Sequence, residues 1–176
     1  AEARRWTAPE RANEAGAPVE TGAETKPRIL VVEDNADLRS YVNSLLQARY
    51  RVMTAVDGVA GLEAALLQSP DLILSDVMMP RMNGLELLRE LRRDERTRAV
   101  PFIFISARAG EEAASGGLDA GADDYVAKPF SAQELVARVD THLRLERLRR
   151  SWAEKLEQSN KELEAFSYSV AHDLRA

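Results

Sequence analysis

Residues 28–34 read RILVVED, a short run of apolar, β-branched residues that ends in two adjacent carboxylates. Runs of this kind are typical of strands that are buried on both faces of a sheet. Similar runs recur along the chain, the last of them weaker than the others, at Arg51–Ala55, Leu72–Leu74, Pro101–Ile105 and Tyr125–Ala127. The sequence therefore predicts five strands.

The segments between these runs place apolar residues at helical spacing. Three such faces are Leu38, Val42, Leu45 and Leu46; Leu62, Ala65 and Leu66; and Leu85, Leu88 and Leu91. Strands that alternate with helices predict a parallel sheet with helices on both faces. Residues 28–146 are therefore expected to form a doubly wound α/β domain with a five-stranded parallel sheet. A fourth helix over Glu111–Asp119 is expected to be short, because it contains Gly116 and Gly117.

The composition restricts the class of protein. The chain has 176 residues, of which 45% are hydrophobic and 30% charged, as in an ordinary globular protein. No apolar run is long enough to cross a bilayer, so no membrane contact is expected. The absence of cysteine excludes disulfides, thiolate zinc sites and cysteine nucleophiles. The net charge of −5 argues against nucleic acid as a general partner. We expect a cytoplasmic protein.

Both ends of the chain are expected to be cuts from a longer polypeptide. The chain begins at Ala1 without a methionine and stops at Ala176 without a helix-stop signal. Residues 1–27 are rich in Ala, Glu, Gly, Pro and Thr, and only Trp6 and Val19 are sizeable apolar residues. Such a stretch buries too little apolar surface to offset its ordering entropy, which predicts a flexible linker.

The fifth helix is expected to be very long. The motif Ser131-Ala-Gln-Glu134 is a capping box that predicts its start, and no proline or glycine follows before the end of the chain. At 1.5 Å per residue an unbroken helix to Ala176 would extend roughly 69 Å, so it should project from the domain. An apolar stripe with a coiled-coil spacing runs along it: Leu145, Leu148, Trp152, Leu156, Leu163, Phe166, Val170 and Leu174.

The stripe predicts a homodimer through this helix. The alternative is a tail that folds back on the domain. A basic cluster near the start of the stripe comprises Arg144, Arg147, Arg149 and Arg150. It is expected to be a solvated flank of the coiled coil rather than a nucleic-acid contact.

Polar side chains follow four of the five predicted strands: Glu33, Asp34, Asp76, Ser106 and Lys128. The carboxyl ends of parallel strands lie at one edge of a sheet, where ligands bind. Three carboxylates would repel one another there, and Mg²⁺, which prefers oxygen ligands, would remove that repulsion. Asp76 is placed to act as a carboxylate nucleophile toward phosphorus, and Lys128 and Ser106 are placed to bind a phosphoryl group. The alternative is a set of structural roles in helix caps and surface turns.

Over residues 27–146 the sequence resembles the receiver domain of two-component response regulators. The matching motifs are ILVVEDN at 29–35, LILSDVMMPRMNGLELL at 72–88, FISA at 104–107 and GADDYVAKPF at 121–130. The resemblance implies a flavodoxin-like sheet of order 2-1-3-4-5 and phosphorylation on Asp76 by a histidine kinase or phosphotransfer protein. It implies Mg²⁺ ligands at Asp34, Asp76 and the Met78 carbonyl, with Glu33 acting largely through water.

The same resemblance implies roles for residues on the last two strands. Ser106 would be the switch hydroxyl, although many relatives carry threonine there. Tyr125 would be the aromatic residue that changes rotamer with it. Lys128 would bind the phosphoryl group and precede a cis bond to Pro129.

Residues 151–176 resemble the start of the dimerisation and phosphotransfer helix of sensor histidine kinases. The motif His172-Asp173-Leu174-Arg175 matches its phosphorylated segment, which makes His172 a candidate phosphoacceptor. His142, the second histidine, is expected to be a surface or packing residue. Residues 147–176 would then be a helical linker and the first part of that helix. The resemblance implies no ATP-binding domain within these residues, so they are expected to accept phosphoryl groups without phosphorylating themselves.

The combined reading is a receiver that regulates an attached histidine kinase transmitter, as in a hybrid kinase. One alternative is a receiver whose helix serves only as a dimerisation rod. Another is a Mg²⁺-dependent phosphatase with an aspartyl nucleophile. Such enzymes carry a second aspartate two residues after the nucleophile as general acid, and this chain has Met78 there.

Overall fold

The computed structural model describes residues 26–107 and 121–173. Its strands are β1 (Arg28–Val32), β2 (Arg51–Ala55), β3 (Leu72–Asp76), β4 (Phe102–Ser106) and β5 (Asp124–Ala127). They form one sheet in the order β2-β1-β3-β4-β5, and every neighbouring pair is parallel. The predicted doubly wound sheet and its strand order are confirmed.

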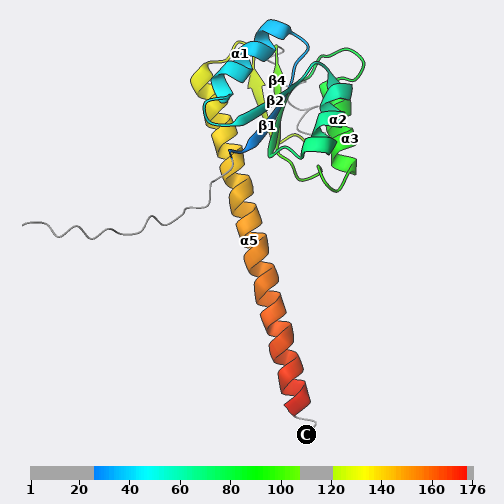
Figure 1. Ribbon diagram of the computed structural model, residues 1–176, viewed down its shortest axis with the longest axis vertical. Coiled ribbons are helices and arrows are strands. Elements are labelled where there is room, and N and C mark those ends of the chain that lie inside the picture. The colour runs from blue at the N-terminus through cyan, green and yellow to red at the C-terminus, as the bar shows by residue number, and fades with distance from the viewer. Residues whose placement is uncertain (1–25, 108–120, 174–176) are drawn as a thin grey trace, which may run out of the picture.

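Helices cover both faces of the sheet. They are α1 (Ala36–Leu46), α2 (Gly58–Gln68), α3 (Gly84–Arg93) and α5 (Ala132–Asp173). Helices α1 and α5 lie on one face, and α2 and α3 lie on the other (Figure 1). The expected fourth helix, Glu111–Asp119, lies outside the described residues, as does nearly all of the expected linker.

The inner strands β1, β3 and β4 are buried on both faces because their side chains alternate between two cores. In β1, Ile29 and Val31 pack in the core beneath α1 and α5, whereas Leu30 and Val32 pack beneath α2 and α3. Every residue of β3 and β4 is buried. This double burial explains why the strands read as continuous apolar runs rather than as alternating polar and apolar residues.

Asparagine and aspartate side chains begin the first three helices. Asn35 caps α1, Asp57 caps α2, and Asn83 forms a reciprocal capping box with Glu86 at the start of α3. The Glu33 and Asp34 side chains therefore do not cap α1. At α5 the Ser131 hydroxyl accepts the N–H of Glu134 at 3.0 Å, as the sequence predicts.

Helix α5 is 42 residues long, which corresponds to about 63 Å. Its first turns bury Leu135, Val139 and Leu143 against the sheet. From Trp152 to Val170 every side chain is exposed, and the helix extends away from the domain (Figure 1). The alternative of a tail folded back on the domain is therefore wrong. Within the described residues, no helix combines the length and apolar character that a bilayer crossing requires.

Candidate functional site

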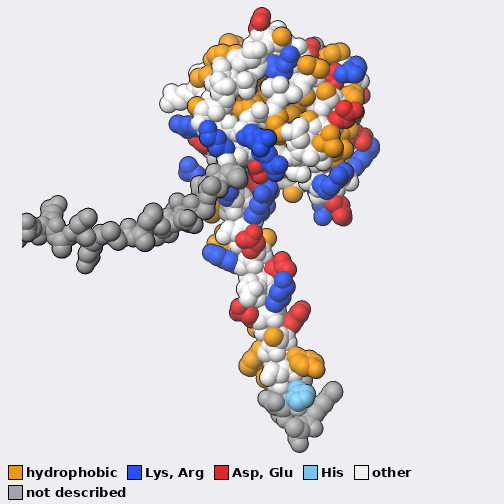
Figure 2. Space-filling view, viewed as in Figure 1, with side chains coloured by type: hydrophobic (Ala, Val, Ile, Leu, Met, Phe, Trp, Pro, Cys, Tyr) orange, Lys and Arg blue, Asp and Glu red, His pale blue; other side chains and the backbone are white. Residues whose placement is uncertain are grey.

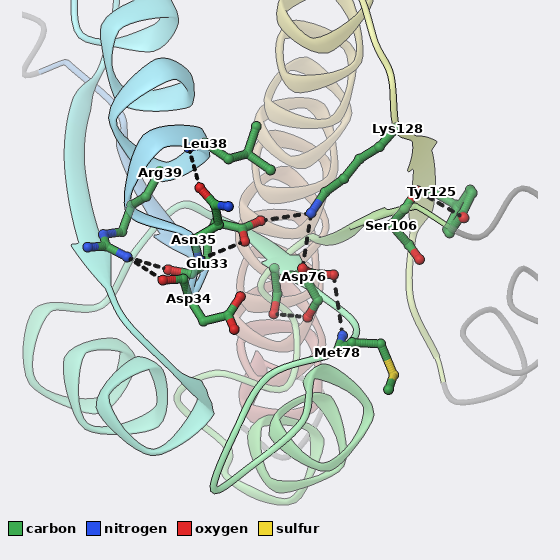
Figure 3. A network of polar contacts seen from close by, with 11 residues as sticks. Glu33, Asp34, Asn35, Leu38, Arg39, Asp76, Met78, Ser106, Tyr125 and Lys128 are labelled. Atoms are coloured by element: carbon green, nitrogen blue, oxygen red, sulfur yellow. Dashed lines mark hydrogen bonds and ion pairs between the residues drawn. The ribbon is translucent and has the colours of Figure 1, made fainter.

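The strand order brings the predicted site residues to one edge of the sheet. Glu33 and Asp34 follow β1, and Asp76 ends the central strand β3. Ser106 ends β4, and Lys128 follows β5 directly. Figure 3 shows these side chains around the carboxyl ends of the strands, with Asp76 in the middle.

Three carboxylates meet there and are called the acidic cluster: Glu33, Asp34 and Asp76. One oxygen from each lies within 4.8 Å of the others. Glu33 and Asp76 are 3% and 8% exposed, whereas Asp34 is open to solvent. No other group of three potential metal ligands occurs among residues 26–107 and 121–173. The donor set is oxygen only, which fits a hard cation such as Mg²⁺.

Lys128 supplies the positive charge of this site. Its Nζ donates to Glu33 Oε2 and to Asp76 Oδ2, each at 3.0 Å (Figure 3). Burial acts to lower the pKa of Lys128, but the hydrogen bonds to Asp76 and Glu33 raise it above its usual value. Lys128 is therefore protonated and positively charged at neutral pH. One ammonium beside three carboxylates leaves the cluster with excess negative charge.

Glu33 is held in place from two sides. Its Oε1 accepts the backbone N–H of Asn35 at 3.1 Å. Arg39 donates to the Glu33 carbonyl at 2.7 Å and fixes the backbone at the end of β1. Burial raises the pKa of Glu33 above its usual range, and the Lys128 and Asn35 hydrogen bonds oppose that rise.

Ser106 connects the ends of β4 and β5. Its carbonyl accepts the backbone N–H of Lys128 at 2.7 Å and lies 3.5 Å from the Tyr125 hydroxyl. Ser106 is buried and Tyr125 is half-buried, packed beside the core under α2 and α3. The predicted cis bond between Lys128 and Pro129 is confirmed.

The loop after β3 carries Met78. Its backbone N–H lies 3.3 Å from Asp76 Oδ1, and its side chain is exposed. Gly84, at the start of α3, donates its N–H to the Val77 carbonyl at 2.9 Å. A Cβ atom on Gly84 would lie 2.2 Å from the Asp76 carbonyl oxygen, so only glycine fits there.

Sequence reasoning missed three residues that support this loop: Gly84, Asp57 and Arg81. Arg81 donates to Asp57, which caps α2 and is 3% exposed. The Asn83-Gly84 pair before an apolar helix was a usable signal for the start of α3. No local spacing links Asp57 to Arg81, because they lie on different elements.

The two histidines lie on α5 outside the acidic cluster. His142 Nε2 is 2.9 Å from Asp124 Oδ2, and its side chain is 15% exposed, which agrees with the expected surface or packing residue. His172 is exposed near the far end of the helix, so the fold does not bring it to the acidic cluster.

Comparisons with known protein sequences indicate one family. A family model described as the response regulator receiver domain matches residues 29–140. Hybrid signal transduction histidine kinase D of Dictyostelium discoideum is 42% identical over 139 residues, covering 79% of this chain and 9% of that protein. The DNA-binding dual master transcriptional regulator RpaA of a Synechocystis strain is 41% identical over 119 residues, covering 67% of this chain and 49% of that protein. The chain thus spans less than half of each of these two relatives.

Solved structures give the same result. The receiver domain of sensor histidine kinase PA1611 from Pseudomonas aeruginosa, solved with a magnesium ion in its active-site cleft, is 35% identical with a TM-score of 0.63. The match covers 66% of this chain and 97% of that one. Chemotaxis response regulator CheY4 of Vibrio cholerae is 31% identical with a TM-score of 0.64, covering 67% of this chain and 99% of that one.

The family match extends over most of the described domain, and its expected sheet order and strand-end carboxylates are present. The chain belongs to the response regulator receiver family, the aspartate-phosphorylated modules of two-component signal transduction.

Proposed function

We propose that Asp76 is the phosphoacceptor of this receiver and that its phosphorylation depends on Mg²⁺. The observation that carries the proposal is the position of Asp76 at the end of the central strand, beside Lys128 and the two carboxylates after β1. An Asp76 carboxylate oxygen attacks the phosphorus of a phosphohistidine on a histidine kinase or phosphotransfer protein. The new O–P bond forms an acyl phosphate as the P–N bond breaks, and the imidazole nitrogen keeps the electron pair.

Lys128 has the charge and the reach to assist this transfer. Its ammonium already contacts Asp76, and its raised pKa keeps it protonated. A phosphoryl group on Asp76 adds oxygens that carry negative charge beside that ammonium. Lys128 therefore stabilises the charge on the phosphoryl oxygens during transfer and in the product.

Asp34, Asp76 and the Met78 carbonyl are proposed to hold the metal ion directly, with Glu33 acting through water. The cluster fits such an ion because its donors are all oxygens and its negative charge exceeds that of Lys128. Asp34 is exposed, and no Lys or Arg of the described residues pairs with its carboxylate. When bound, Mg²⁺ offsets the charge of the carboxylates and of the phosphoryl oxygens.

Ser106 and Tyr125 are proposed to transmit the phosphorylation of Asp76 to the surface of the domain through a movement of their side chains. Ser106 lies at the end of the strand next to β3, where its hydroxyl can donate to a phosphoryl group on Asp76. Tyr125 lies beside Ser106, so its ring can follow that movement inward. The affected surface includes β5 and the start of α5.

Helix α5 is proposed to join the receiver to a histidine kinase transmitter, with dimerisation through the apolar stripe and His172 as its phosphoacceptor. The match to a protein named as a hybrid signal transduction histidine kinase supports this arrangement. The exposure of His172 suits attack by a nucleophilic ring nitrogen. The remaining alternative is a rod that only dimerises.

The central test is labelling with radioactive acetyl phosphate. We expect one acid-stable, base-labile phosphoryl group per chain with Mg²⁺, none with EDTA, and none in Asp76→Asn. Asp71→Asn is the matched control, because it removes a carboxylate at the other end of β3. Undiminished labelling of Asp76→Asn overturns the assignment. Sustained hydrolysis of a generic phosphate ester would indicate a phosphatase instead.

The role of His172 needs a separate experiment. A histidine kinase ATP-binding domain is supplied in trans with ATP, and His172→Gln is compared with His142→Gln. We expect acid-labile label on the parent and on the His142 variant but not on the His172 variant. Equal labelling of the His172 variant supports the rod.

A further inference from the structure

A wide cleft opens at the end of the sheet opposite the acidic cluster. It has a volume of about 1170 Å³ and lies between the starts of β1 and β2 and the middle of α5. Its lining is Lys26, Pro27, Arg28, Arg49, Tyr50, Arg51, Asp71, Asp140, Leu143, Glu146, Arg147 and Arg150, here called the basic cleft. Figure 2 shows Lys and Arg side chains gathered where α5 leaves the domain.

The basic cleft carries a concentrated positive charge. Six cations face three carboxylates, which gives a net charge of +3, whereas the whole chain carries −5. Clefts lined mainly by one sign of charge focus the field and attract counter-ions. Two exposed residues of the basic cluster near the start of the apolar stripe, Arg147 and Arg150, form part of this wall.

The three carboxylates of the cleft are already engaged. Asp140 accepts from Arg49 at 3.1 Å and from the Tyr50 hydroxyl. Glu146, 7% exposed, accepts from Arg150 at 3.0 Å. Asp71 accepts the backbone N–H of Arg28 at 2.8 Å. Arg49 and Arg150 are thus neutralised within the cleft.

Four cations remain without a carboxylate partner within residues 26–107 and 121–173: Lys26, Arg28, Arg51 and Arg147. Lys26 donates to the Ala48 carbonyl at 3.0 Å. Arg28 and Arg51 begin two neighbouring strands, and Arg147 lies across from them on α5. A ligand with several adjacent negative charges can contact both walls.

The lining selects for charge rather than for apolar surface. Pockets for ordinary small molecules are mostly apolar, whereas nine of the twelve residues here are charged. Tyr50 is 6% exposed, so its ring gives no face on which a base could stack. Guanidinium groups bind phosphate through paired hydrogen bonds.

We propose that the basic cleft binds a chain of adjoining phosphoryl groups, either free or as the polyphosphate part of a nucleotide whose base stays outside. Arg28 and Arg51 contact it from the sheet, and Arg147 contacts it from α5. The bound anion then bridges the rigid sheet and the helix at the point where the helix leaves the domain. This site is independent of Asp76, because it lies at the other end of the strands.

The test is calorimetric titration of the full chain with sodium tripolyphosphate, without Mg²⁺ and in 0.15 M salt. We expect saturable binding that Arg28→Gln/Arg51→Gln/Arg147→Gln weakens by about ten-fold or more. Arg89→Gln/Arg98→Gln/Arg144→Gln removes the same charge from exposed positions outside the cleft. We expect this control to keep its affinity within about two-fold.

Further experiments distinguish the possible sources of the ligand and control for misfolded variants. ATP should compete with tripolyphosphate, and AMP should not. Both triple variants should still be phosphorylated on Asp76, which shows that they fold. If the cleft triple variant does not fold, Arg147→Gln alone, a change on the exposed helix surface, should still weaken tripolyphosphate binding. Absence of saturable binding, equal losses in cleft and control variants, or equally tight AMP binding would overturn the proposal.

Discussion

Arg81 donates through Nε, at 2.7 Å, and through a terminal nitrogen to Oδ2 of Asp57, which joins the loop after β3 to the start of α2. The other Asp57 oxygen accepts the N–H of Ala60 at 2.9 Å. Arg81 has a φ of 64°, which is unfavourable for a residue with a side chain. Beside it, Met82 donates its N–H to the Pro80 carbonyl at 2.7 Å. The ion pair therefore stabilises a strained turn in the loop that carries Met78.

Asp57→Asn should destabilise the domain in a pH-dependent way. Asparagine keeps an oxygen for the Ala60 N–H but loses the charge opposite Arg81, so we expect a loss of about 1–2 kcal/mol at pH 7. The Ala60 and Arg81 hydrogen bonds lower the pKa of Asp57 below its usual value. The contribution is therefore complete above about pH 4 and is lost as the pH falls through the folded-state pKa.

The measurement is urea unfolding of parent and variant from pH 7 down to pH 3. The difference in unfolding free energy should shrink toward the acid end. A difference that stays constant over that range would contradict the charge pair as its cause.

Arg81→Gly should be more stable than Arg81→Ala. Both variants lose the ion pair, but glycine adopts a positive φ without the clash that a Cβ atom causes. We expect glycine to be favoured by about 1 kcal/mol, measured by chemical unfolding at pH 7. Equal stability of the two variants would show that the turn relaxes when the arginine is removed.

Gly84→Ala should impair both the fold and phosphorylation. The added methyl group would lie 2.2 Å from the Asp76 carbonyl oxygen and 2.8 Å from the Phe104 ring. Because both neighbours are buried, the backbone next to Asp76 has to shift, at an expected cost of about 2 kcal/mol or more. Thermal unfolding and acetyl phosphate labelling check the two effects. An unchanged labelling rate at a lower melting temperature would show that the shift spares the Asp76 carboxylate.

Leu163→Gln/Phe166→Gln should convert a dimer into a monomer. These side chains are 63% and 68% exposed in the single chain, although both are large and apolar. Their burial against a second copy should contribute roughly 1.5–3 kcal/mol for each residue in each chain. Sedimentation equilibrium measures the change. The control variant Glu157→Gln/Glu164→Gln changes the other side of the same helix and should remain dimeric. A parent chain that is monomeric would contradict the prediction.

The sequence predicted the sheet and the acidic cluster because both depend on regular patterns. Apolar runs mark the strands, and a parallel sheet brings their carboxyl ends to one edge, which located Glu33, Asp76 and Lys128 together. Helix faces were predicted less well. On α3 the fully buried residues include Leu87, whereas Leu85 is only partly buried, because the contact with the sheet is turned from the expected face.

The supporting contacts could not be predicted in the same way. Asp57 and Arg81 are 24 residues apart and meet only because two loops lie side by side. Asp140 reaches Tyr50 across 90 residues, again without a local pattern. Many other acidic and basic pairs in the sequence have similar separations, so pairing depends on the folded positions of the elements.

The dual role of α5 has a mechanical consequence. Leu135, Val139 and Leu143 anchor the first turns of the helix in the core. The part from Trp152 to Asp173 extends beyond the domain for about 33 Å. A rotation of about 5° at the core would move the far end, about 45 Å from Leu143, by about 4 Å. Displacements too small to disturb packing beside the sheet are thereby magnified at the tip.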